Sequence, residues 1–133
     1  METDSLTQFG LEVQTVQTAT GQGEPIRILT PTGHLGFTMM EPESFRRGMA
    51  QAPHFLVADS GSSDIGPHPL GADEPCSPEA WQRHDLALML TAARRQGVPM
   101  IIGTASDTGT DRGVDAYARI IREVAEEEGL PPF

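Results

Sequence analysis

The fold is decided by the stretch FLVADSGSSDIGPHPLG, which covers residues 55–71. Its first four residues are apolar and favour a β-strand, and the Gly-, Ser- and Asp-rich segment after them favours a loop. The same order recurs in IRILTPTGHLGF at 26–37 and in MIIGTASDTGTDRG at 100–113. Each loop leads into a segment whose apolar residues have helical spacing. Three copies of this order predict a β-α repeat.

The repeat predicts an α/β fold: a small three-layer Rossmann-like domain with a short parallel sheet and helices on both faces. Ligands of such sheets bind outside the carboxyl ends of the strands, so we expect the three loops to form one site at that edge. The strands are expected near 26–30, 54–58 and 98–103, and the loops at 31–38, 59–77 and 103–113.

The first 24 residues differ from the rest of the chain. Residues 1–24 form a polar, Thr- and Gln-rich N-terminal arm, and residues 25–133 hold the βαβαβα domain. The arm is expected to be extended or to add one edge strand. Three parallel strands leave a sheet edge open, which predicts that the arm or another chain covers it. We therefore expect a homo-oligomer or a larger partner subunit.

Charge and hydropathy exclude several classes of partner. The net charge of −10 over 133 residues argues against nucleic acid, which binds clustered Lys and Arg. No apolar run approaches the roughly 20 residues that span a bilayer, and the N-terminus lacks a signal-peptide pattern, so we predict no membrane partner and a cytoplasmic location. Cys76 is the only cysteine and is expected to be a loop residue or, alternatively, a catalytic thiol.

The first loop, PTGHLGF at 31–37, offers two candidate residues. Gly33 is predicted to bind substrate through its backbone, since glycines allow amide groups to turn toward an anion; a tight strand-to-helix turn needs the same residues. His34 is predicted to carry a proton, because imidazole ordinarily titrates near pH 6.5. The alternative is a hydrogen-bonded surface histidine.

The second loop is about 19 residues long, well beyond the usual 2 to 6 of a β-α connection. Asp59 directly follows a buried strand and is predicted to be a catalytic acid, base or ligand, with Asp64 as a second carboxylate; ordinary Asx turns are the alternative. Ser77-Pro78-Glu79 predicts a helix start with Ser77 as the N-cap. The other predicted substrate-binding residues of this loop are Ser60, Gly61, Ser62 and His68.

The third loop and the preceding helix carry further polar residues. Thr104 follows the last strand and is predicted to bind substrate. Arg112 is predicted to bind a substrate carboxylate or phosphate, or else to form a salt bridge with a nearby aspartate such as Asp107. Asp85 interrupts an apolar helical stripe and faces the site or marks the stripe's edge. The chain has no HExxH, CxxC or EF-hand pattern, so we predict no metal site and leave the cofactor unknown.

Four strings carry a family resemblance: RILTPTGHLGF at 27–37, ADSGSSDIGPHPLGADEP at 58–75, QRHDLALMLTAAR at 82–94 and VPMIIGTASDTGTDRGVD at 98–115. They resemble the amino-terminal portion of the acyclic terpene utilization AtuA-like family, over roughly residues 25–133. The resemblance implies a βαβ region belonging to a longer protein. Where that family is expected to carry Ala-Gly-Gly, this chain has Ala105-Ser106-Asp107.

Two functions from different classes fit these patterns. The first is an enzyme, or half of one, that acts on a small anionic metabolite such as an organic acid or its CoA thioester. Its reaction is expected to be that of a lyase, isomerase or hydrolase rather than an oxidoreductase. The alternative is a non-catalytic accessory subunit that docks a larger partner chain through its loops and open sheet edge.

Overall fold

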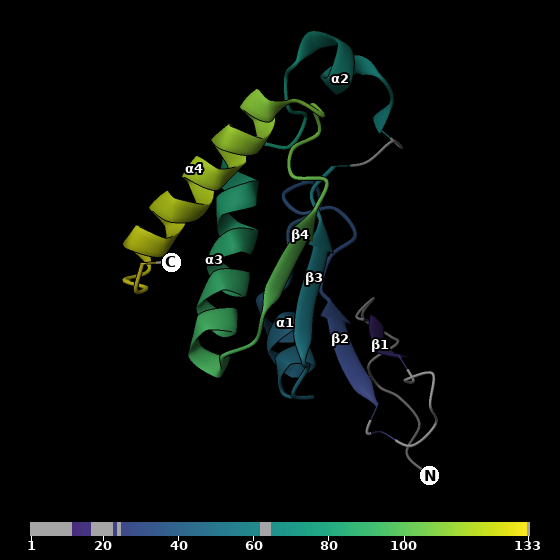
Figure 1. Ribbon diagram of the computed structural model, residues 1–133, viewed down its shortest axis with the longest axis vertical. Helices are drawn as coiled ribbons and strands as arrows, with labels where there is room; N and C mark the ends of the chain where they lie inside the picture. The colour runs from purple at the N-terminus through teal and green to yellow at the C-terminus, as the bar shows by residue number, and fades with distance from the viewer. Residues whose placement is uncertain (1–11, 17–22, 24, 62–64, 133) are drawn as a thin grey trace.

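The computed structural model describes residues 12–16, 23, 25–61 and 65–132. From β2 onward each strand is followed by a helix, as the repeat predicts, and β3 is followed by two, the short α2 and the long α3 (Figure 1). The predicted Ser62 and Asp64 fall outside the described residues. The elements are β1 Glu12–Val16, β2 Ile26–Thr30, α1 Pro42–Met49, β3 Phe55–Asp59, α2 His68–Ala72, α3 Glu79–Gln96, β4 Met100–Gly103 and α4 Asp111–Glu127.

The strands form one four-stranded sheet in the order β1-β2-β3-β4. β2, β3 and β4 are parallel, which confirms the small α/β fold with a short parallel sheet. β1 comes from the N-terminal arm and pairs antiparallel with β2, so the arm supplies an edge strand. Within the described part of the chain, β4 has a neighbour on one side only.

Local sequence signals explain where the long helices begin and end. α1 begins after Glu41, whose carboxylate accepts the amides of Glu43 and Ser44. α3 ends at Gly97, whose positive φ of 66° suits glycine at a helix terminus. α4 begins after Thr110, whose hydroxyl accepts the amide of Gly113. No helix among the described residues is long and apolar enough to cross a membrane.

The hydrophobic core lies on one face of the sheet. Leu29 of β2, Leu56 of β3 and Met100 of β4 occupy facing positions on this side. They belong to, or pack against, a single cluster that also contains buried residues of α1, α3 and α4, and Figure 1 shows α3 and α4 side by side. The three long helices α1, α3 and α4 therefore cover the same face of the sheet, whereas helices on both faces were predicted from the sequence.

The strand order accounts for this difference. Each crossover passes to the next strand in the same direction, and right-handed crossovers in a constant direction place their helices on the same face. The opposite face presents apolar side chains outside the core cluster. These are Ile28 and its partner Phe55, and Val57 and its partner Ile101.

Candidate functional site

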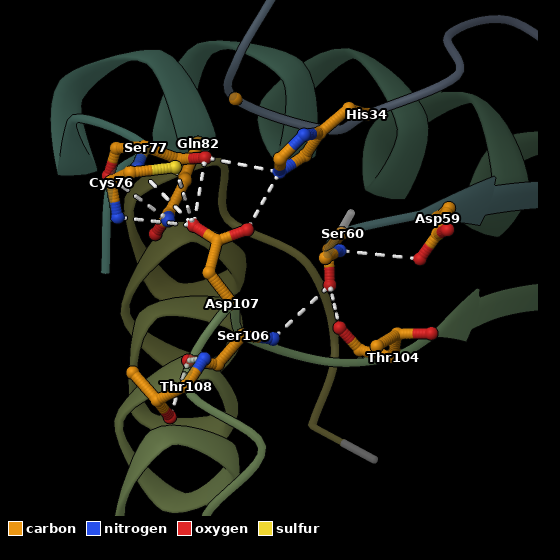
Figure 2. A network of polar contacts seen from close by, with 12 residues as sticks. His34, Asp59, Ser60, Cys76, Ser77, Gln82, Thr104, Ser106, Asp107 and Thr108 are labelled. Carbon is orange, nitrogen blue, oxygen red and sulfur yellow. Dashed lines mark hydrogen bonds and ion pairs between the residues drawn. The ribbon is translucent and has the colours of Figure 1, made fainter. Parts of the chain in front are cut away.

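The carboxyl edge of the sheet brings together residues from three loops (Figure 2). His34 follows β2, Ser77 precedes α3, and Asp107 lies between β4 and α4. The His34 imidazole is almost completely buried, with 8% of the residue exposed. The predicted convergence of the loops thus produces a buried cluster of three polar side chains.

One nitrogen of His34 is directed into this cluster. Nε2 lies 2.9 Å from Asp107 Oδ1 and 3.2 Å from Ser77 Oγ. Asp107 Oδ1 accepts no well-aligned hydrogen bond from any described residue, so its contact with Nε2 is chiefly electrostatic. Ser77 therefore provides the aligned hydrogen-bond partner of the imidazole.

The hydrogen bonds of Ser77 assign the tautomer of His34. A hydroxyl has one hydrogen to donate, and Ser77 Oγ donates it to Asp107 Oδ2 at 3.3 Å. Ser77 Oγ must then accept from Nε2–H, and the Asp107 carboxylate also favours a proton on Nε2. Neutral His34 therefore carries its lone pair on Nδ1, for which the described part of the chain provides no hydrogen-bond partner.

Asp107 Oδ2 accepts hydrogen bonds from Cys76 and Ser77, the residues just before α3. It receives the backbone amides of Cys76 at 3.1 Å and Ser77 at 3.3 Å, together with the Cys76 thiol at 3.2 Å. A carboxylate oxygen can accept several hydrogen bonds at once, so Asp107 joins the segment before α3 to the loop before α4. Ser77 was predicted to cap α3, and this is wrong: the N-cap position is Pro78, and Ser77 turns toward Asp107 and His34 instead.

The Cys76 thiol is held in its protonated form. Cys76 is exposed, but partial desolvation of its thiol raises the pKa, and the hydrogen bond to the Asp107 carboxylate raises it further. A nucleophilic cysteine needs the opposite environment, one that stabilises the thiolate. These contacts favour the interpretation of Cys76 as a loop residue.

A second group of contacts joins the β3 loop to the β4 loop. Ser60 is buried, and its single hydroxyl hydrogen lies between the carbonyls of Thr104, at 3.1 Å, and Gly103, at 3.4 Å, while its oxygen accepts the amide of Ser106. Gly61 packs so closely that an added Cβ would lie 2.8 Å from Thr104 O. Ser60, Gly61 and Thr104, all predicted to bind substrate, thus meet in one place through internal contacts.

This loop junction is also where the backbone is strained. Thr104 has a φ of 47° and Ser106 a φ of 82°, in the left-handed region that side-chain-bearing residues seldom adopt. Strained residues need surroundings that hold them in place. The hydroxyl of Ser60 does so here, because it contacts both residues.

Asp59 ends β3 with an exposed side chain. Its Oδ1 accepts the amide of Gly61 at 3.2 Å, which is the local turn that the sequence analysis gave as the alternative to catalysis. Its backbone carbonyl accepts the amide of Leu35 at 2.8 Å, so Asp59 and the loop of His34 are joined directly. Both candidate acid–base groups therefore belong to one edge of the sheet.

Other predicted residues lie outside the polar cluster. Arg112 is 72% exposed at its side chain, and its guanidinium bonds to Asp73, 2.5 Å from Oδ2 and 2.9 Å from the backbone oxygen. His68 is exposed at the start of α2, and Gly33 is exposed in the first loop. Arg112 has therefore formed a salt bridge, with an aspartate from the second loop rather than with its neighbours in sequence.

Asp107 and Ser77 were not predicted from the sequence to belong to the site. Asp107 was considered only as a salt-bridge partner of Arg112, and Ser77 only as a helix cap. The available signal was the departure at 105–107, where Asp107 stands in a position expected to be glycine. In the described part of the chain, no group of three or more His, Cys, Asp or Glu side chains is placed to hold a metal ion.

No family model, curated protein or solved structure matches this chain.

Proposed function

We propose that this chain is an enzyme, or half of one, that uses His34 to transfer a proton to or from a small anionic metabolite. One observation carries the proposal: the imidazole is buried at the carboxyl edge with Nε2 fixed by Asp107 and Ser77. This arrangement leaves Nδ1 as the basic nitrogen. A general base needs a defined tautomer and a fixed orientation, and both are provided here.

The chemistry that fits this arrangement is removal of a proton by Nδ1 and its return to the product. Asp107 would stabilise the imidazolium formed when Nδ1 accepts the proton, since its carboxylate lies 2.9 Å from Nε2. Asp59, exposed at the same edge, is the second acid or base. A lyase, isomerase or hydrolase reaction of an organic acid or CoA thioester uses such steps.

Charge restricts how the substrate is bound. The chain has a net charge of −10, and the guanidinium of Arg112 already pairs with Asp73. In the first loop, the amides of His34 and Leu35 bond to Thr32 Oγ1 and to the Asp59 carbonyl. Recognition of an anion would therefore depend on the Gly33 backbone or on Arg112 released from Asp73.

The test begins with a thermal-shift screen of organic acids, inorganic phosphate and CoA esters. Compounds that raise Tm are incubated with the protein in D₂O, and deuterium incorporation at carbon is followed by NMR. We expect His34→Gln to abolish incorporation, whereas His54→Gln, at the amino end of β3, should retain it. Failure of every compound to stabilise the protein, or incorporation by His34→Gln at the parent rate, would contradict the proposal.

A second function is favoured by a different observation. The sheet face opposite the helices is apolar, and Ile101 on it is 52% exposed. Parallel sheets are almost always covered on both faces, which supports an accessory subunit that docks a larger chain. If no anion binds while His34→Gln and Asp59→Asn both retain association with another chain, this function replaces the enzymatic one.

A further inference from the structure

Asp85 is a buried carboxylate that the proposed chemistry does not use. It lies within α3 and is completely buried. Its Oδ2 accepts the amide of Gly36 at 3.0 Å, and its Oδ1 accepts the amide of Met40 at 2.8 Å. The partly exposed His84 places Nδ1 2.9 Å from Oδ1. One carboxylate of the helix therefore holds two amides of the loop that follows β2.

The segment between these two amides covers the imidazole of His34. Phe37 stacks on His34 with 5.0 Å between the ring centroids and 11° between the ring planes. Gly36 adopts a φ of 80°, and a Cβ added there would overlap the side chain of Gln82 on α3. The backbone of this segment is therefore held against α3, while the Phe37 ring, in a residue that is 46% exposed, rests on the imidazole of His34.

A completely buried carboxyl group needs hydrogen-bond partners, because burying a polar group without them costs free energy. Residues 36–40 form no helix or strand, so the amides of Gly36 and Met40 cannot be satisfied by a regular ladder. A carboxylate provides two acceptor oxygens, one for each amide. An apolar residue in the same place would fill the core and leave both amides unpaired.

We propose that Asp85 is a positioning residue for His34. Through the amides of Gly36 and Met40 it holds the ring of Phe37 against the imidazole, which keeps Nε2 on Asp107 and leaves Nδ1 free. The functional importance of this positioning rests on the proposed role of His34. The positioning itself is measurable without a substrate.

The experiment follows the ring nitrogens of His34 by NMR in protein labelled with ¹⁵N-histidine. The parent should show the Nε2–H tautomer and slow exchange of the Gly36 and Met40 amides. In Asp85→Asn the side-chain amide offers only one acceptor oxygen, so one of the two backbone amides should exchange at least tenfold faster. His34 should then populate both tautomers.

A control separates positioning from a general loss of stability. Val124→Ala creates a cavity in the core from a buried position on α4 and is expected to destabilise the fold without touching the loop. It should leave the His34 spectrum unchanged. If Asp85→Asn also retains the parent His34 spectrum, or if Val124→Ala alters it to the same extent, the inference is wrong.

A second variant covers the case in which Asp85→Asn does not fold. Phe37→Leu keeps an apolar side chain and leaves the contacts of Asp85 in place, but removes the ring that stacks on His34. Mixed tautomers in this variant support the inference, and an unchanged spectrum overturns it. Because these readouts are independent of turnover, an inactive protein would contradict the proposed function without affecting this result.

Discussion

The thiol of Cys76 reports on the charge of its neighbour, Asp107. Burial and the Asp107 carboxylate both raise the pKa of the thiol, so thiolate is scarce at pH 8. In Asp107→Asn the negative charge is absent, and we expect iodoacetamide to alkylate Cys76 severalfold faster at that pH. A tenfold increase would correspond to a pKa lower by one unit. Asp115→Asn, an exposed site on α4, is the matched control and should react at the parent rate.

The same raised pKa sets the sign of a pH effect on stability. The folded chain holds the thiol proton more tightly than the unfolded chain does, so the thiol contributes to the free energy of unfolding. This contribution is complete below the ordinary thiol pKa of 9.0. It is lost as the pH rises toward the folded-state pKa.

In the alkylation experiment, a slower reaction of Cys76 in Asp107→Asn than in the parent would contradict the proximity of the thiol and the Asp107 carboxylate.

Tyr117 is the only tyrosine, and its side chain ends in the core. The residue is 2% exposed, and burial raises the pKa of its hydroxyl more than the nearby Ser60 side chain lowers it. Among the described residues the hydroxyl forms no well-aligned hydrogen bond, so Ser60 is at most a weak partner. An unpaired buried hydroxyl costs about 1–3 kcal/mol. We expect Tyr117→Phe to increase the free energy of unfolding by about 1 kcal/mol in urea titrations. A decrease of similar size would contradict this and show that Ser60 pairs effectively with the hydroxyl.

Some residues of the site could be predicted from the sequence and others could not. Asp59 ends β3 and His34 lies in the loop after β2, so the β-α pattern alone placed both at the carboxyl edge. Asp107 and Ser77 could not be assigned in this way, because their roles depend on contacts between loops more than 25 residues apart. Arg112 illustrates the same limit, since its partner Asp73 belongs to another loop.

At the level of elements, the first turn of α4 is packed against the loop that precedes it. A Cβ added at Gly113 would overlap Thr108 Oγ1 and lie 2.5 Å from Ser106 Oγ, two hydroxyls that bond to each other. Alanine is intrinsically better than glycine in a helix by about 1 kcal/mol, but overpacking costs about 1–3 kcal/mol. We therefore expect Gly113→Ala to destabilise the protein by about 1–2 kcal/mol in urea unfolding.

Gly71→Ala is the matched control for this substitution. Gly71 lies in α2, and an added Cβ would meet no atom within 4 Å. This variant should be neutral or slightly stabilising, in line with helix propensity. Equal effects of the two substitutions would contradict the close packing of α4 on its preceding loop.

The elements were more predictable than their arrangement. Apolar runs and Gly-rich loops are local signals, and they located β2, β3, β4 and the long helices close to their observed positions. Which face each helix covers depends on strand order, which no local pattern encodes. The prediction of helices on both faces was wrong for the long helices, because the strands follow one another in a single direction across the sheet.

The whole molecule has a helix-covered face and an uncovered one. Ile28, Phe55, Val57 and Ile101 lie on the uncovered face, outside the core cluster. β4, which carries Ile101, is also the outermost strand of the described sheet. Apolar surface and an open strand edge both favour association, because burying them removes apolar area from water and satisfies backbone groups. The molecule is therefore expected to be at least a dimer in solution.

Light scattering after size-exclusion chromatography at low micromolar concentration tests this expectation against the 14.3 kDa mass of one chain. Ile101→Glu places a charge on the uncovered face and should shift the mass toward the monomer. Val114→Glu is the matched control, since Val114 is a comparably exposed aliphatic residue on α4. High salt should not dissociate the assembly, because apolar contacts are not screened. A parent protein that is monomeric, or that loses its partner equally in both variants, would show that the uncovered face does not drive association.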